Sequence, residues 1–220
     1  MTADNNNSTW LASGATPTRF ILLRHGVTAY SVQRRFAGRS DLPLLDEGIA
    51  QARAAARRTS ELTPIDGVIS SPLRRTRQTA AAVAEQLGLP VALDEGLIET
   101  DFGSWDGYTF DELRQADPEL LASWLADPEV APPGGESQLQ VSARVLAARD
   151  RLVKAHPGRT LVLVTHVSPI KVLAADVLGA PASAVHRMYL APASVSVLDY
   201  FPDGPMSLRC FNDTAHLPGG

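Results

Sequence analysis

Two histidines in this sequence each come after a run of apolar residues. His25 follows the run at positions 20–23, with Arg24 in between, and His166 follows the run at 161–164. Uninterrupted apolar runs of this length are typical of parallel strands that are buried on both faces. Because the carboxyl ends of parallel strands meet at one edge of a sheet, we expect the two imidazoles to lie close together.

Arginine side chains accompany the two histidines. Arg75 follows the apolar pair at 68–69 in the stretch SSPLRR, so a third predicted strand directs it toward the same edge. Guanidinium groups bind phosphate oxygens in a bidentate manner. We therefore expect Arg24, Arg75 and a protonated His166 to surround a phosphoryl group.

His25 is the predicted nucleophile of this site. An imidazole nitrogen can attack phosphorus to form a phosphohistidine, provided that an acceptor, here a backbone carbonyl near Gly26, holds the other ring nitrogen. The leaving group then needs a proton. Glu99 is the preferred donor, because the apolar pair at 97–98 predicts that it lies at a strand end, and Asp101 is the alternative.

Two other kinds of function remain open at this point. A metallohydrolase could use both histidines with Glu99 or Asp101 as ligands, although the chain has no HxH or HExxH spacing. A phospholigand-binding domain without catalytic activity would need neither a nucleophile nor an acid. The preferred interpretation is a phosphatase that acts through His25, and this enzyme would use no metal and no cofactor.

The elements that position these residues alternate along the chain. Apolar runs alternate with helical patterns, which predicts an α/β fold: a three-layer α/β/α sandwich with a mainly parallel, doubly wound sheet. Helices are predicted over 46–61, 71–87 and 138–156. Their predicted end signals are Asp46 as an N-cap, Ser71 with Pro72 as an N-cap and first residue, Gly88 as a C-cap, and Ser137 with Gln140 as a capping box.

Three segments depart from this alternation. Residues 97–133 are predicted to form a helical insertion over one edge of the sheet, with short helices at 110–115 and 119–125 and with Trp105 and Trp124 as packing residues. The stretch SVSVLDY at 194–200 predicts a strand paired with 206–211. Residues 1–18 are expected to be a flexible tail or linker before a catalytic domain at 19–220.

Composition excludes several classes of partner. The chain has 220 residues with a formal net charge of -4 and no long basic run, so we expect no nucleic-acid or membrane partner. Cys210 is the single cysteine, which suits a cytoplasmic location. His186 and His216 have no polar neighbours that suggest chemistry, and we interpret them as structural.

Five sequence blocks carry a resemblance to a known family. LLRHGVT, SSPLRRTRQTA, LIETDFGSWDG, PPGGES and LVLVTHVSPI resemble, in this order, the signature blocks of the histidine phosphatase superfamily, in the branch of the phosphoglycerate mutases and alpha-ribazole phosphatases. The resemblance covers residues 19–200. It implies His25 as the phosphorylated nucleophile, Glu99 as proton donor, and Arg24, Arg75 and His166 as phosphate ligands.

The resemblance also implies further residues and a reaction. The additional phosphate-site or substrate-site positions are Thr28, Ser31, Gly38 and Val167, and Arg74 is the variable position that points to solvent. Val167 replaces a glycine of the family, so the backbone after His166 should be ordinary. Mutases of the family hold a carboxylate with a lysine and an arginine pair in a long insert, and this chain has no lysine between 99 and 133. Metal-independent, acid-phosphatase-type hydrolysis of a small phosphorylated substrate is therefore preferred over mutase-type phosphoryl transfer.

Within the family, the chain is most similar to the phosphatase part of actinobacterial proteins that fuse ribonuclease H to an alpha-ribazole phosphatase-like domain. This resemblance implies that the chain is part of a longer polypeptide. A homodimer is the other expected association.

Overall fold

A single six-stranded sheet organises the chain. The computed structural model describes residues 15–219, and the strand order across the sheet is β3-β2-β4-β1-β5-β6. Strands β3, β2, β4 and β1 are parallel, β5 runs antiparallel to β1, and β6 runs antiparallel to β5. The bounds are β1 Thr18–Arg24, β2 Gly67–Ser70, β3 Val91–Leu93, β4 Thr160–Thr165, β5 Val195–Tyr200 and β6 Met206–Asp213.

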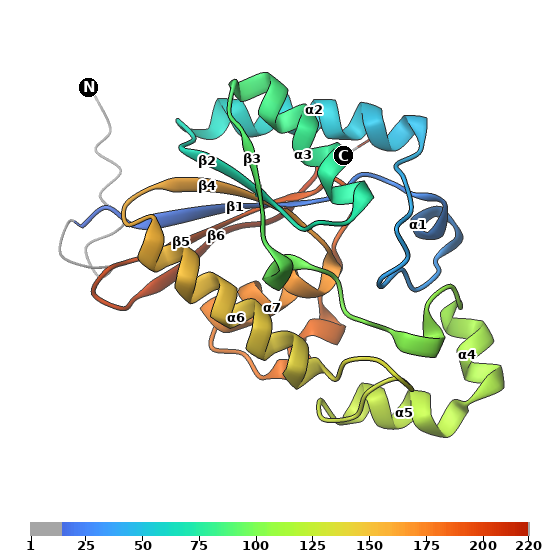
Figure 1. Cartoon of the computed structure of the whole chain (residues 1–220). Helices are drawn as coiled ribbons and strands as arrows, with labels where there is room; N and C mark the ends of the chain where they lie inside the picture. The colour runs from blue at the N-terminus through green and yellow to red at the C-terminus, as the bar shows by residue number, and fades with distance from the viewer. Residues whose placement is uncertain (1–14, 220) are drawn as a thin grey trace.

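Helices cover both faces of the sheet, so the predicted three-layer α/β/α sandwich is confirmed. Figure 1 shows α2 and α3 above the sheet and α6 and α7 below it. The helices are α1 Ala29–Gln33, α2 Asp46–Leu62, α3 Arg74–Leu87, α4 Phe110–Ala116, α5 Pro118–Ala126, α6 Gln138–Ala155 and α7 Val167–Val177. Short 3-10 helices lie at η1 Glu95–Leu97, η2 Gly103–Trp105 and η3 Ala182–Arg187.

The two faces of β1 explain its uninterrupted apolar sequence. Phe20 and Leu22 pack into the core between the sheet and helices α6 and α7. Ile21 and Leu23 pack into the core on the opposite face, between the sheet and helices α2 and α3. All four side chains are fully buried. Successive side chains of a strand point to opposite faces, so a strand between two helical layers must be apolar at every position.

The insertion forms a separate third core. Phe102, Trp105, Leu113 and Leu121 are buried together, and Phe36 packs against them. The two predicted short helices are confirmed as α4 and α5, which lie at the lower right of Figure 1, away from the strands. Its core joins the loop after β1 and contains no residue of a strand, whereas Leu97, at the start of the segment, packs in the sheet core beside α6.

Several helix ends differ from the predictions. Leu45, not Asp46, is the N-cap of α2, and α3 begins at Arg74 with Leu73 as its N-cap, so Ser71 and Pro72 precede that helix. Neither observed cap makes a side-chain hydrogen bond, so the polar residues nearby misled the prediction. The left-handed C-cap at Gly88 is confirmed, as is the capping box of α6, in which Ser137 and Gln140 bond each other's backbone N–H groups.

The chain enters the sheet one residue before the predicted domain start. Thr18 is the first residue of β1, and its hydroxyl donates to the carbonyl of His156 at 3.0 Å and accepts from the N–H of Gly158 at 3.1 Å. Residues 1–14 of the predicted tail lie outside the described residues. The predicted β5–β6 hairpin is confirmed, whereas the short strand β3 was not predicted. Among residues 15–219, no helix is both long and apolar enough to cross a bilayer.

Candidate active site

A cavity of about 230 Å³ opens beyond the carboxyl ends of β1 and β4. Strand ends, the loop after β1, the insertion, the start of α7 and η3 all contribute to it. Its lining residues are Arg24, His25, Thr28, Ser31, Arg35, Phe36, Ala37, Glu99, Thr100, Phe102, Trp124, Glu136, Gln138, Val167, Ser168, Lys171, Val185 and His186.

His25 has one ring nitrogen fixed and the other unpaired. Its Nδ1 lies 2.8 Å from the carbonyl oxygen of Gly26, as expected from the sequence. A carbonyl can only accept, so Nδ1 carries the proton and Nε2 presents its lone pair. Burial, together with the positive charges of Arg75 and Arg24, holds the pKa of His25 well below its usual value. The ring is therefore neutral at physiological pH, the form that a nucleophile needs.

Arg24 directs a partly unsatisfied guanidinium at the cavity. One terminal nitrogen donates to the carbonyl of Leu190 at 2.5 Å, but the buried Nε has no hydrogen-bond partner among the described residues. Burial lowers the pKa of Arg24 to about 10, and the charge of Glu99 opposes the shift. The side chain thus remains a cation at the cavity lining, which is what an anionic ligand requires.

The imidazole of His166 packs against that of His25, so the expected meeting of the two rings takes place. The ring centroids are 5.2 Å apart in an edge-on arrangement. Nδ1 of His166 accepts from Arg75 Nε at 3.3 Å, and its Nε2 donates to Ser71 Oγ at 2.7 Å. The prediction of a protonated His166 is wrong, because burial and the neighbouring Arg75 hold its pKa well below the usual value.

Arg75 is fully buried and lies behind the cavity lining. Its terminal nitrogens donate to the carbonyls of Ser40 at 2.7 Å, Gly38 at 2.9 Å and Ala37 at 3.0 Å. Gly38 is likewise buried and does not line the cavity. An added Cβ at Gly38 would lie 2.7 Å from the carbonyl oxygen of Thr100, so this glycine permits close packing of the loop on the insertion.

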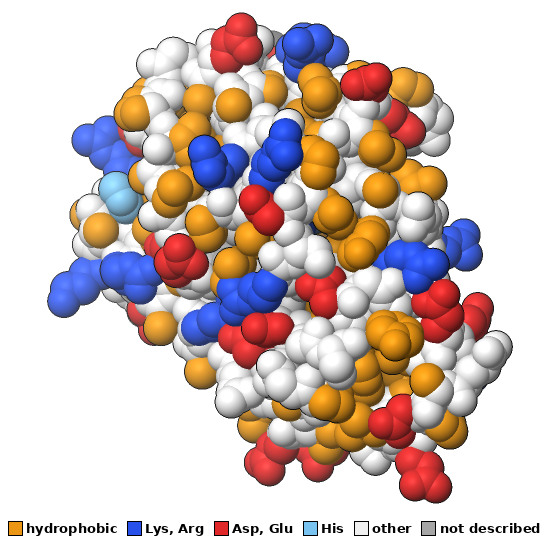
Figure 2. Space-filling view, turned by 45° about the vertical axis from the view of Figure 1, so that its right-hand side comes forward, with side chains coloured by type: hydrophobic (Ala, Val, Ile, Leu, Met, Phe, Trp, Pro, Cys, Tyr) orange, Lys and Arg blue, Asp and Glu red, His pale blue; other side chains and the backbone are white. Residues whose placement is uncertain are grey.

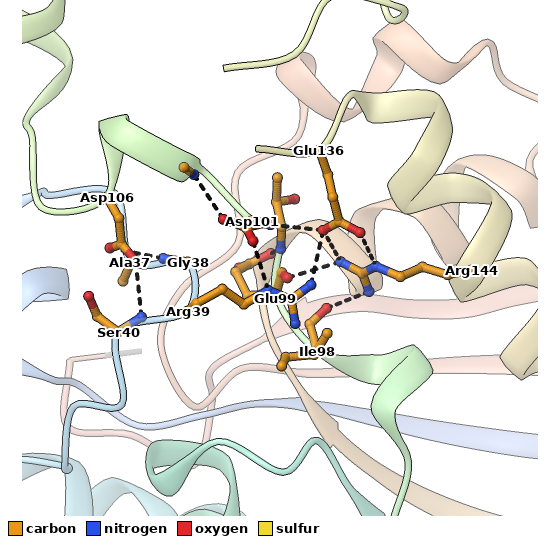
Figure 3. A network of polar contacts seen from close by, with 12 residues as sticks. Ala37, Gly38, Arg39, Ser40, Ile98, Glu99, Asp101, Asp106, Glu136 and Arg144 are labelled. Atoms are coloured by element: carbon orange, nitrogen blue, oxygen red, sulfur yellow. Dashed lines mark hydrogen bonds and ion pairs between the residues drawn. The ribbon is translucent and has the colours of Figure 1, made fainter. Parts of the chain in front are cut away.

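The insertion fixes the loop at residues 37–40, whose carbonyl groups bind Arg75. The carboxylate of Asp106 accepts from the N–H of Gly38 at 3.3 Å and from the N–H of Ser40 at 3.0 Å (Figure 3). Arg35 also connects the two segments, since it donates to the carbonyl of Gly107 and to the carboxylate of Glu112. The position of Arg75 therefore depends on residues that lie far along the chain.

Glu99 lines the cavity, whereas the alternative acid Asp101 does not. The carboxylate of Glu99 accepts from the N–H groups of Thr100 at 2.9 Å, Val167 at 3.0 Å and Ser168 at 3.1 Å. It thereby caps the first turn of α7 directly after His166. The predicted strand end before Glu99 is wrong, because the preceding element is the 3-10 turn η1.

Glu136, just before α6, and Arg144, within α6, fix the segment that carries Glu99. Arg144 donates to the carbonyls of Ile98 at 2.7 Å and Glu99 at 2.9 Å, and it also forms two bonds with the carboxylate of Glu136 (Figure 3). Glu136 in turn accepts from the N–H of Asp101 at 2.8 Å. Burial raises the pKa of Glu136, but Arg144 and that N–H outweigh it, so the net shift is downward. The sequence patterns did not indicate this role for either residue.

Thr28, Ser31 and Val167 all lie at the cavity, as the resemblance implies. Thr28 and Ser31 form the capping box of α1, so their polar atoms also bond each other. Val167 begins α7 and does not have a positive φ, which confirms the expectation of an ordinary backbone. An added Cβ at Gly26 would lie 2.4 Å from the carbonyl oxygen of Gly48 in α2, so close packing requires this glycine.

The cavity wall, a name we use for Phe36, Phe102, Trp124 and His186, is aromatic. Trp124 lies edge-on to His186 with ring centroids 4.9 Å apart, and Phe36 lies edge-on to Phe102 at 4.8 Å. The interpretation of His186 and Trp124 as purely structural is incomplete, because both line the cavity, whereas Trp105 is buried beside them and does not. Lys171, which also lines the cavity, was not identified from the sequence.

Figure 2 shows the exposed surface around the insertion. Acidic side chains gather along the lower rim, where α4 and α5 lie. Within the part of the chain that the structure describes, no group of three His, Cys, Asp or Glu side chains could hold a metal ion.

Comparisons with known proteins agree with this geometry. The histidine phosphatase superfamily (branch 1) matches residues 20–214. A solved structure of mycobacterial glucosyl-3-phosphoglycerate phosphatase in complex with VO3 superposes with a TM-score of 0.81 at 34% identity, over 90% of this chain and 100% of that one. A mutant of phosphoserine phosphatase from Entamoeba histolytica, solved in complex with phosphoserine, gives a TM-score of 0.82 at 28% identity over 91% and 100%.

A longer relative also matches. The chain is 43% identical over 208 residues to the "Bifunctional protein Rv2228c" of Mycobacterium tuberculosis, and the match covers 94% of this chain. The chain spans only 57% of the length of that relative.

Proposed function

The chain belongs to the histidine phosphatase superfamily, and we propose that it hydrolyses phosphomonoesters through a phosphohistidine on His25. The observation that carries the proposal is the hydrogen bond from His25 Nδ1 to the Gly26 carbonyl, since it leaves Nε2 unprotonated at the cavity. The mechanism needs no metal and no cofactor.

In the first step, the phosphoryl group of the substrate binds to the guanidinium group of Arg24, which lines the cavity. His25 Nε2 attacks phosphorus in line, a nitrogen–phosphorus bond forms, and the bond from phosphorus to the ester oxygen breaks. Glu99 receives a proton as the phosphate dianion binds and gives it to that oxygen, so the product leaves as a neutral alcohol and Glu99 is again a carboxylate.

In the second step, a water molecule attacks the phosphorus of the phosphohistidine. Glu99 takes a proton from this water, the nitrogen–phosphorus bond breaks, and inorganic phosphate leaves. His25 and Glu99 then return to their starting states.

Arg75 and His166 complete the proposed phosphate site from behind His25. The Nε2–H of His166 binds Ser71 in the free protein, and we propose that it exchanges this hydroxyl for a phosphate oxygen. Arg75 keeps its bonds to the loop carbonyls and contributes its positive charge through His166. Thr28, Ser31 and Val167 line the region where the phosphate binds, and Gly38 acts through the loop that it shapes.

We also propose that the chain corresponds to the phosphatase part of a fusion protein. A relative that is called bifunctional and extends well beyond the matched region supports it. The chain would then supply the phosphatase of a longer polypeptide. A homodimer and a cytoplasmic location stay predictions from the sequence.

The proposal is tested by hydrolysis of p-nitrophenyl phosphate. We expect His25→Ala to lower kcat by roughly 10⁴-fold or more, because it removes the nucleophile. His156→Ala is the control, since that residue lies at the end of α6 and does not line the cavity. Full activity in His25→Ala, or loss of wild-type activity in EDTA, would contradict the mechanism, the second result in favour of a metallohydrolase.

Hydrolysis is distinguished from mutase-type transfer by the fate of the phosphoryl group. We expect inorganic phosphate to account for the substrate consumed. Formation of 2-phosphoglycerate from 3-phosphoglycerate faster than release of phosphate would instead identify a mutase.

A further inference from the structure

Lys171 projects into the cavity without a partner. It is one of only two lysines in the chain, with Lys154, and it is half-buried. No hydrogen bond or ion pair joins its ammonium group to another of the residues at 15–219. A half-buried cation at the wall of a cavity is costly unless an anion joins it there.

The same face of α7 offers a second polar group. Ser168 lies three residues before Lys171, so the two side chains are neighbours on the helix, and both line the cavity. The Ser168 hydroxyl makes no hydrogen bond with any described residue, while its N–H binds Glu99. An unpaired hydroxyl and an unpaired ammonium group thus lie side by side next to the proposed acid.

The charges around Lys171 favour a ligand with a single negative charge. Burial lowers the pKa of Lys171, Arg24 lowers it further, and Glu99 opposes the shift. The neighbouring His186 has its own pKa lowered by burial and by Lys171, so it adds no positive charge at neutral pH. Glu136 also lines the cavity, but its carboxylate is bonded to Arg144 and Arg39, so its charge is already compensated. One ammonium group beside a hydroxyl matches a carboxylate, with its single charge, better than a second phosphate dianion.

We propose that Lys171 and Ser168 bind a carboxylate on the alcohol part of the substrate, while Arg24 and His25 hold its phosphoryl group. The inference rests on the proposed function and narrows the substrate class to phosphorylated hydroxy or amino acids and their derivatives. The insertion supplies no lysine for such a carboxylate, and the cation comes from α7 instead.

The kinetic test compares two substrates that differ in this group alone. 3-Phosphoglycerate carries a carboxylate where glycerol 3-phosphate carries a hydroxymethyl group. We expect Lys171→Met to lower the ratio of their kcat/KM values by about 10- to 100-fold, the loss of a charge-assisted hydrogen bond. Lys154→Met is the control, because Lys154 lies on α6 and does not line the cavity.

A binding measurement tests the site without turnover. The two lysines of His25→Ala protein are acetylated with an N-hydroxysuccinimide ester and followed by mass spectrometry. We expect 3-phosphoglycerate to slow the labelling of Lys171 severalfold relative to Lys154, and glycerol 3-phosphate to do so much less.

The outcomes separate this inference from the proposed function. If His25 is required for hydrolysis but Lys171→Met leaves the ratio unchanged and no ligand protects Lys171, the carboxylate site is wrong and the phosphatase stands. If Lys171→Met weakens the binding of propane-1,3-diol bisphosphate more than the binding of 3-phosphoglycerate, the group bound by Lys171 is a second phosphate. This result also overturns the proposal. If His25→Ala retains full activity, the phosphatase mechanism fails, and the labelling alone decides whether a carboxylate binds at Lys171.

Discussion

The two sides of the cavity are built in different ways. On one side, Arg24, His25, Arg75 and His166, here called the strand-end group, are held by backbone carbonyls, by one hydroxyl and by one another. On the other side, the cavity wall consists of aromatic rings in edge-on contact, most of them from the insertion and the loop after β1.

This difference separates reaction from selectivity. Hydrogen bonds with defined donors and acceptors fix the tautomer and position of each group in the strand-end group, so a change there affects every substrate. Apolar contacts in the cavity wall have no such directionality, so a change there alters which substrates fit. Glu99, Arg144 and Lys171 lie between the two sides, and their variants show where the boundary runs.

The largest expected effect that depends on the substrate comes from Glu99→Gln. Loss of a general acid slows departure of a poor leaving group by about 10³-fold, whereas p-nitrophenolate leaves without a proton. We therefore expect kcat for an alkyl phosphate to fall about 10³-fold and kcat for p-nitrophenyl phosphate to fall less than about 10-fold. Asp101→Asn is the control. Equal losses on both substrates would show that Glu99 is not the proton donor.

Arg24→Met should affect all substrates alike. Removal of one preorganised donor from a charged transition state costs about 10²- to 10³-fold in rate, and we expect this loss in kcat/KM for alkyl and aryl phosphates. Arg74→Met is the matched control, because Arg74 is exposed at the start of α3, as predicted. A loss confined to one class of substrate would place Arg24 with the cavity wall instead.

Arg144→Met tests whether the segment carrying Glu99 must be held in place. Arg144 touches backbone and Glu136 but does not line the cavity, so it is a positioning residue. We expect kcat on alkyl phosphates to fall about 10-fold with little change in KM, because misplacement of the acid slows proton transfer rather than binding. Arg151→Met, which removes a pair between the same helix and Asp94, is the control. A rise in KM with unchanged kcat would contradict the positioning role.

The pH dependence of stability should also distinguish the two sides. His25 and His166 are buried with pKa values well below the usual 6.5, so below that pH the unfolded chain binds more protons than the folded one. The free energy of unfolding should therefore fall as the pH drops below 6.5, by up to about 1.4 kcal/mol per pH unit for each histidine.

Urea titrations at pH 7 and pH 5 measure this slope. We expect His166→Gln to lose less stability than the wild type over that interval. His186→Gln, in the cavity wall, should reduce the slope less, because His186 is more exposed and its pKa is lowered less. Identical slopes for wild type and His166→Gln would mean that His166 titrates normally in the folded protein.

The smallest expected effect belongs to the cavity wall itself. Trp124→Leu removes aromatic surface but keeps an apolar residue, so we expect KM for aryl phosphates to rise by about 10-fold or less, with kcat and the constants for glycerol 3-phosphate little changed. Steady-state kinetics on the two substrates measures it. A large fall in kcat on both would show that the insertion contributes to the reaction itself.

The strand-end group could be predicted because its signals are local. An apolar run that ends in a polar residue locates the end of a buried strand, and parallel strands bring such ends together, so His25 and His166 could be paired across the sequence. The hydrogen bond of His25 to the Gly26 carbonyl followed from the tautomer that a nucleophile needs. The charge of His166 was predicted wrongly, because its burial beside Arg75 depends on the tertiary structure.

The other side of the cavity could not be predicted in the same way. Glu99 lies after a 3-10 turn, which short apolar pairs do not distinguish from a strand. Trp124 and His186 come together only because the insertion packs onto η3, a contact without a sequence signal. Lys171 did have one: once α7 is taken to begin after His166, positions 167, 168 and 171 share a face, and that face adjoins the predicted nucleophile.

In the proposed mechanism, Nε2 of His25 becomes phosphorylated during turnover, and rapid quench of the wild-type enzyme with a ³²P-labelled phosphomonoester tests this step most directly. We expect an acid-labile label that appears before steady state, maps to the peptide containing His25, and is absent from His25→Ala. Steady turnover without any labelled protein, or a label on another residue, would contradict the mechanism.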